Sequence, residues 1–168
     1  MLVYHPAFDL YNGVFRILQL LEYMKQKHVE VDKIRIWDFY LTFPNEARKI
    51  IFPRELAELK KIFKKKEPNP YEDLIDPKRI LDRMKSYQMA ALKCLASYNL
   101  IDQTELTNGI VSRTNEPLPG EIRKKIADIS TEKENTLKLI IGFKDLPLYG
   151  RAGLKYRTGL IEFKYDSN

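Results

Sequence analysis

The residues of this sequence that could do chemistry are few and lie far apart. The two histidines, His5 and His28, fall in different predicted elements, and neither stands in a His-x-x-x-His or Cys-x-x-Cys ligand pattern. Cys94, the single cysteine, lies on a predicted amphipathic helix without a neighbour that would activate it, which favours a buried structural thiol over a nucleophile. We therefore predict no catalytic residue and no zinc site.

Two further patterns approach a ligand site without completing one. Gly150-Arg151-Ala152-Gly153 is glycine-rich, but it lacks the Walker Lys-Ser/Thr pair and a strand-loop-helix setting, so it is interpreted as a flexible turn. Glu72-Asp73 could bind magnesium, but no third ligand is identifiable. An ATPase, a protease and a Rossmann enzyme are disfavoured, and we predict a non-enzymatic protein without metal, cofactor or small-molecule substrate. A small nuclease with scattered carboxylates stays open.

Basic side chains form two clusters that could contact phosphate. The first closes a predicted helix, where lysines also interact favourably with the helix dipole. The second occupies the first half of a predicted long helix, where recognition helices face the DNA groove, although Asp82 and Glu105 interrupt the positive surface. The candidate DNA or phosphate contacts are Lys64, Lys65 and Lys66 in the first cluster and Lys78, Arg79, Arg83 and Lys85 in the second. Arg113, after the predicted hairpin described below, is a further candidate contact.

The elements that would position the second cluster span residues 76–114. Asp76-Pro77 is a helix start, and Asn99 suits a left-handed helix end. One face of this helix is predicted to be buried; it consists of Ile80, Met84, Tyr87, Ala91, Leu95 and Tyr98. Leu106-Thr107 and Ile110-Val111 flank Asn108-Gly109, a pair that suits a type I′ turn. A long helix followed by such a hairpin predicts a winged-helix-like unit.

The remaining sequence predicts a mainly α fold of the α+β class. Helices are expected over residues 10–24 and 33–42, and Thr131 with Glu134 has the form of a capping box. Leu-Ile-Glu-Phe-Lys-Tyr at residues 160–165 predicts a C-terminal strand. The second helix is dense in aromatic residues, among which a core role for Trp37 is favoured over an exposed platform for bases.

Length and composition bound the remaining choices. With 168 residues and 44% hydrophobic residues, the chain is expected to form a single domain over residues 1–168, with a soft boundary at the proline-containing stretch 67–71. Neither a signal peptide nor a membrane span is recognised, and one cysteine excludes an internal disulfide, so a cytoplasmic location is expected. The net charge of +6 is compatible with nucleic acid, with an acidic protein partner, or with solubility alone.

Several stretches together resemble the small middle component of ABC-three-component systems. The opening stretch is His5-Pro6-Ala7-Phe8-Asp9, followed by Val14-Phe15-Arg16 and Leu20-Leu21. Ile36-Trp37-Asp38-Phe39-Tyr40-Leu41-Thr42-Phe43-Pro44 is the central one, and Gly153-Leu154-Lys155-Tyr156-Arg157-Thr158-Gly159-Leu160 the last. These pieces span most of the chain, and none is a catalytic signature.

The resemblance implies a non-enzymatic accessory subunit. In bacterial defence loci, including Lamassu, such a subunit is encoded between an SMC-like ATPase and an effector. It would bind the coiled-coil ATPase near its head, connect it to an effector nuclease, and belong to an assembly that senses foreign DNA. The residues in the matched stretches that we expect to have a special structural or interface role are Arg16, Trp37, Asp38, Tyr40, Arg157 and Thr158.

The alternative is a free-standing winged-helix transcriptional regulator. It predicts specific duplex binding by the isolated protein, with the steep salt dependence that phosphate contacts produce. The sequence does not decide between these hypotheses, because a basic helix also suits an acidic protein partner and a fold alone does not specify function.

Overall fold

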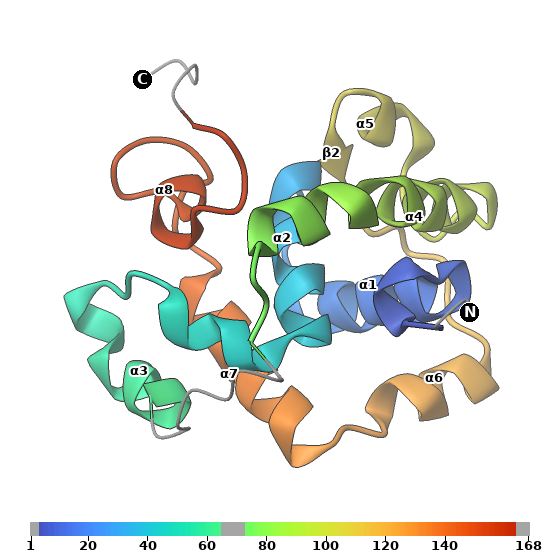
Figure 1. Ribbon diagram of the computed structural model, residues 1–168. Coiled ribbons are helices and arrows are strands. Elements are labelled where there is room, and N and C mark those ends of the chain that lie inside the picture. Colours follow the sequence, from blue (N-terminus) through green and yellow to red (C-terminus); the bar gives the residue numbers. More distant parts are fainter. Residues whose placement is uncertain (1–3, 65–72, 164–168) are drawn as a thin grey trace.

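Helices make up most of the structure, a computed structural model that describes residues 4–64 and 73–163. Two helices and a short strand open the chain: α1 (Leu10–Met24), β1 (Val29–Glu30) and α2 (Val31–Thr42). The centre of the molecule is completed by the long α4 (Pro77–Ser97), which packs against α1 and α2. Figure 1 shows α4 beside α1, with α6 and α7 on the side of α1 that faces away from α4. The mainly α fold predicted from the sequence is confirmed.

The remaining elements are short and surround this centre. The short 3-10 helices η1 (Pro6–Phe8), η2 (Pro44–Lys49) and η3 (Arg54–Leu56) connect longer ones. The other helices are α3 (Ala57–Lys64), α5 (Gln103–Thr107), α6 (Gly120–Ala127), α7 (Thr131–Phe143) and α8 (Leu154–Thr158). In Figure 1, α3 and α7 lie together on one side of the molecule, and α6 runs below α1.

Local sequence signals explain where the main helices begin and end. The carboxylate of Asp9 accepts a hydrogen bond from the Asn12 amide at 2.9 Å, and that of Asp76 accepts one from Arg79 at 3.1 Å, so both aspartates satisfy first-turn amides. Asn99 adopts a φ of 59° just after α4, as predicted for a left-handed helix end. The predicted capping box of Thr131 and Glu134 is wrong: Ser130 caps α7 by accepting a hydrogen bond from the Lys133 amide, and the third helical residue is then Lys133 rather than a glutamate.

The predicted hairpin wing is wrong. Asp102 caps a short helix by accepting a hydrogen bond from the Glu105 amide, so the stretch expected to be the first strand is α5. Asn108 has a φ of −87°, whereas a type I′ turn needs positive φ at both central positions. Ile110–Val111 forms the strand β2 instead, which pairs antiparallel with β1, about 80 residues earlier in the sequence.

Two further expectations need correction. The predicted C-terminal strand is not formed over its described residues 160–163, which lack regular structure. The buried face of α4 is rotated: Leu81, Gln88 and Leu92 are buried, whereas Tyr87 and Tyr98 are 38% and 71% exposed. The soft boundary at 67–71 lies outside the described residues, and no helix within the described ranges has the length and apolarity to cross a bilayer.

Candidate functional site

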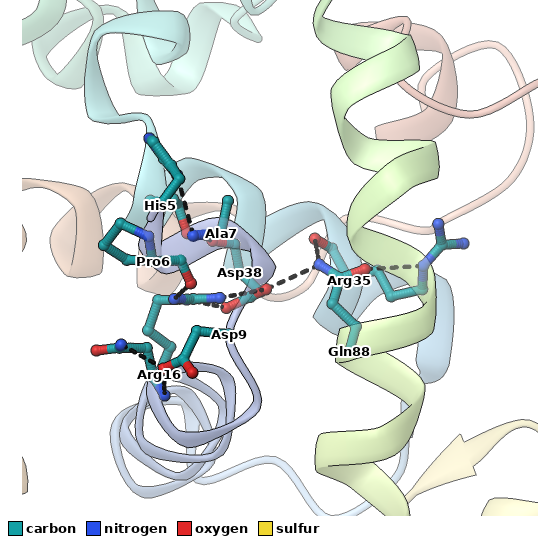
Figure 2. A network of polar contacts seen from close by, with 10 residues as sticks. His5, Pro6, Ala7, Asp9, Arg16, Arg35, Asp38 and Gln88 are labelled. Carbon is teal, nitrogen blue, oxygen red and sulfur yellow. Dashed lines mark hydrogen bonds and ion pairs between the residues drawn. The ribbon is translucent and has the colours of Figure 1, made fainter. Parts of the chain in front are cut away.

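A buried polar network joins the three central helices. Asp38 on α2 accepts hydrogen bonds from Arg16 Nε on α1 at 2.6 Å and from Gln88 Nε2 on α4 at 2.8 Å. The side chains of Arg16 and Asp38 are 7% and 0% exposed, so this ion pair is withdrawn from water. Figure 2 shows Asp38 between Arg16 and Gln88. The three helices are thereby held together by one carboxylate.

The network continues along α2 to the surface. Arg35 donates from Nε to Gln88 Oε1 at 3.1 Å, and Gln88 Nε2 also approaches the Arg35 carbonyl oxygen at 3.1 Å. The guanidinium of Arg35 also donates to Asp32 at 2.9 Å. Because the donors of this cluster are paired with acceptors inside it, the cluster stabilises the packing of the helices.

The N-terminal segment before α1 is hydrogen-bonded to the same network. The Pro6 carbonyl oxygen accepts a hydrogen bond from Arg16 Nη1 at 2.8 Å. His5 Nδ1 accepts one from the Ala7 amide at 3.1 Å, and its ring stacks on Phe43 with centroids 5.2 Å apart. Burial, and then the charge of Arg16, lower the pKa of His5. An acceptor role at Nδ1 agrees with a neutral ring, so His5 acts here as a cap.

The motif residues predicted for interface use are mainly internal. Trp37 is 0% exposed and Tyr40 2% exposed, and they pack with each other in the core; burial, and then Glu46, raise the pKa of Tyr40. Together with Arg16 and Asp38, they cannot touch a partner in this conformation. Their observed role is packing.

The last two motif residues hold α8 in place. Arg157 donates from Nη1 to the Ile51 carbonyl oxygen at 2.9 Å and from Nε to that of Ala152 at 2.7 Å. The Arg157 carbonyl oxygen in turn accepts the Ile51 amide at 2.9 Å. Thr158 donates from its hydroxyl to the Leu154 carbonyl oxygen at 2.7 Å. Both residues are partly exposed.

The predicted phosphate contacts do not form one positive surface. Lys78 lies 3.5 Å from Glu162, and the guanidinium of Arg83 lies 4.6 Å from the ring centroid of Phe8. Arg79 and Lys85 are exposed and line a cleft of about 560 Å³ that also contains carboxylates, among them Asp82. This cleft is mixed in charge rather than basic.

The other predicted phosphate contacts either form hydrogen bonds within the protein or lie outside the residues that the structure describes. Arg113 donates to Glu22 Oε1 at 2.9 Å and to the carbonyl oxygens of Leu100 and Glu116, so its guanidinium braces the loop after β2. Lys65 and Lys66 are outside the described residues, and Lys64 ends α3 with a side chain that is not described either.

The described residues contain no cluster of three or more metal-ligating side chains. His5 and His28 belong to separate contacts: His28 Nδ1 lies 2.8 Å from the Ser112 hydroxyl, next to the two-stranded sheet. The glycine-rich turn at residues 150–153 packs its backbone closely, since a Cβ on Gly153 would lie 2.3 Å from the Tyr149 carbonyl oxygen.

An apolar groove on the surface is the feature that the sequence did not reveal. It encloses about 760 Å³ between the first half of α1, the end of α4, the loop 116–119 and the start of α6. Its floor is formed by Leu18, Leu95 and Leu100, which are almost fully buried. Its rim carries Leu10, Tyr11 and Tyr98, which are 43%, 58% and 71% exposed.

The sequence pattern did not indicate that the groove residues form a binding surface. Tyr98 belongs to the apolar stripe that the sequence assigns to the core, and Cys94, predicted as a buried thiol, is partly exposed in the groove. The available signal was the width of the apolar surface on α1, where Val14 and Phe15 extend the stripe beyond what one neighbouring helix covers.

Comparison with family models gives one match. The model for the ABC-three component (ABC-3C) system Middle Component 5 matches residues 2–166, which is nearly the whole chain. The matching range includes the residues of the buried network and those of the apolar groove. Searches of curated proteins and of solved structures find no match.

Proposed function

The chain belongs to the family of ABC-three component system Middle Component 5, and we propose that it acts as a non-enzymatic adaptor that binds the SMC-like ATPase of a bacterial defence complex. Membership of a system with several components implies protein partners. The proposal adds the identity of one partner, the ATPase, and a link to an effector nuclease.

The apolar groove is the observation that carries this proposal. Contiguous exposed apolar surface on a folded protein is typical of an interaction site. Here three large side chains, Leu10, Tyr11 and Tyr98, are exposed around a floor of buried leucines, and the hydroxyls of the two tyrosines suit a partly hydrated interface. The buried network supports the same role, because it makes α1 and α4 a rigid base for the groove.

Reconstitution with the neighbouring subunits tests the proposal. The tagged chain is purified from its native host at low and at moderate salt, and proteins recovered in stoichiometric amounts are identified by mass spectrometry. A recovered coiled-coil ATPase is then expressed separately and mixed with the chain, and a joint peak in size-exclusion chromatography is expected. An ATPase that neither copurifies nor forms this peak would contradict the adaptor role.

Direct DNA contact by this subunit is the second candidate. Exposed Arg79 and Lys85 on α4 favour it, while the neighbouring Asp82 weakens the positive field around them. The hypothesis of a free-standing winged-helix regulator has lost its main support, because the predicted hairpin is absent from residues 106–111. Steep loss of duplex affinity with salt, measured on the isolated protein, would restore that hypothesis.

A further inference from the structure

We propose that the apolar groove receives a basic amphipathic α-helix from the protein partner. This inference rests on the adaptor function proposed above and adds the chemistry of the segment that docks.

The walls of the groove offer few backbone hydrogen bonds. Two walls are α1 and α4, whose amides beyond the first helical turn are bonded within the helices, and the opposite wall contains Pro117 and Pro119, which have no N–H group. An extended segment would therefore bury backbone groups without partners, at a cost in free energy. A helix satisfies its own backbone, so a helix is the occupant that this surface favours.

The charges that line the groove are of one sign. Asp9 and Glu116 are its charged lining residues, and both are acidic, although the chain as a whole carries a net charge of +6. Backbone and side-chain hydrogen bonds from Asn12 lower the pKa of Asp9. The nearby Lys125 keeps its positive charge, since its Nζ donates to the neutral Tyr11 hydroxyl at 2.6 Å and lies 5.1 Å from the ring centroid of Phe15, so two carboxylates stand against one cation at the groove. A complementary helix places lysine or arginine beside its apolar stripe.

The exposed rim favours a helix over a small ligand as the occupant of the groove. A small apolar molecule would fill the floor and leave Leu10 and Tyr98 in water, whereas a helix with apolar residues at i, i+3, i+4 and i+7 covers floor and rim together. The extension of apolar surface beyond the floor, onto side chains that are 43% and 71% exposed, favours the larger occupant.

Cys94 provides a direct readout of occupancy, because it is the single cysteine of the chain and lines the groove. The probes are two synthetic amphipathic peptides of about 18 residues, or about five helical turns. They share one leucine stripe, which is flanked by lysine in the first peptide and by glutamate in the second. The rate of Cys94 alkylation by iodoacetamide and the anisotropy of labelled peptide are measured on the full chain.

We expect the lysine peptide to slow alkylation and to bind more tightly than the glutamate peptide. Glu116→Lys should weaken the lysine peptide and strengthen the glutamate peptide, each by about two- to fivefold, as for an exposed charge pair. Leu10→Asp and Tyr98→Asp should each reduce affinity by at least about fivefold, as for interface residues that contribute to binding. Ile75→Asp is the matched control, because Ile75 is fully exposed and lies outside the groove.

The outcomes separate this inference from the adaptor function. Equal binding of both peptides, or no protection of Cys94 by either, overturns the basic helix. If the ATPase copurifies but Cys94 reacts as fast in the complex as in the free chain, the adaptor stands and the groove inference fails. If the lysine peptide protects Cys94 but the ATPase does not bind, the groove inference stands and the adaptor function fails.

Discussion

Replacing Asp38 by asparagine should destabilise the protein strongly. The substitution keeps the shape of the side chain but leaves the buried charge of Arg16 without its counterion. It also turns one acceptor into an NH₂ group, although Asp38 accepts from Arg16 on one oxygen and from Gln88 on the other. In either orientation of the new amide, an N–H therefore faces another N–H.

The expected loss follows from this geometry. Breaking a buried ion pair by removing one partner costs about 3–5 kcal/mol, which is a third or more of the stability of many domains. For a chain of this length, a change of about 1 kcal/mol moves the melting temperature by about 2–4 °C. Asp38→Asn should accordingly lower the melting temperature by about 6–20 °C.

Urea unfolding measures the loss with a probe built into the core. Trp37 is the single tryptophan and is 0% exposed, so its fluorescence reports the packing of α2, and circular dichroism reports the helices. Coincident transitions would support the two-state treatment on which the free energy depends. Asp82→Asn, which changes an exposed carboxylate of α4, is the control and should stay within about 0.5 kcal/mol of the natural protein.

A double-mutant cycle decides whether the pair itself carries the effect. Arg16→Met removes the other charge, and the double variant should lose less than the sum of the two single losses, by about 0.5–3 kcal/mol, because neither charge is then left alone. A loss below about 1 kcal/mol for Asp38→Asn, or strictly additive losses, would refute the view that this ion pair holds the three helices.

Three further predictions concern separate parts of the fold. Since the pKa of His5 is lowered in the folded state, the unfolded state binds more protons in the window just below the ordinary value of 6.5. Stability should therefore decrease as the pH is lowered through that window, and His5→Asn should flatten this dependence in urea titrations between about pH 5 and 8. Gly153→Ala should cost about 1–3 kcal/mol in thermal unfolding, because its Cβ would meet the Tyr149 carbonyl oxygen, whereas Gly120→Ala, with open space around it, should be tolerated. If this subunit contacts DNA through α4, neutralising three cations together should weaken duplex affinity strongly and flatten its salt dependence in fluorescence anisotropy, and an unchanged affinity would reject that surface. These cations are Arg79, Arg83 and Lys85.

Local signals in the sequence were sufficient for the elements that depend on near neighbours. Asp76 and Asn99 delimit α4 because a cap needs only a side chain and a few adjacent amides. The hairpin failed for the opposite reason. The partner of Ile110–Val111 is Val29–Glu30, far away in the sequence, and the residues beside the turn formed a helix once Asp102 capped it. Periodicity and turn preference contain no information about such a distant strand.

The buried network could not have been predicted from its separate residues. Gln88 lies on the inner face of α4. A glutamine in a sequence pattern indicates an exposed position, and its burial is explained only by its hydrogen bonds to Asp38 and Arg35 on α2. This contact also explains the rotated face of the helix, because burying Gln88 brings Leu81 and Leu92 inward and leaves Tyr87 partly in water. Pairing across three helices is tertiary information that a pattern along one helix does not hold.

The location of the network and of the groove separates two roles within one family. The stretches that carry the family resemblance contain Arg16, Asp38 and Arg157, which fasten the frame through buried or backbone-directed contacts. Leu10, Tyr98 and Glu116, which shape the rim of the proposed binding surface, lie outside those stretches, whereas Asp9, Val14 and Phe15, which also line the groove, lie inside them. Because rim residues are exposed, they can change with little effect on stability, whereas the frame residues cannot. Exchange of these three rim residues between two family members should therefore transfer the preference for a partner helix while leaving the melting temperature nearly unchanged; a preference that stays with the frame would place the partner site elsewhere.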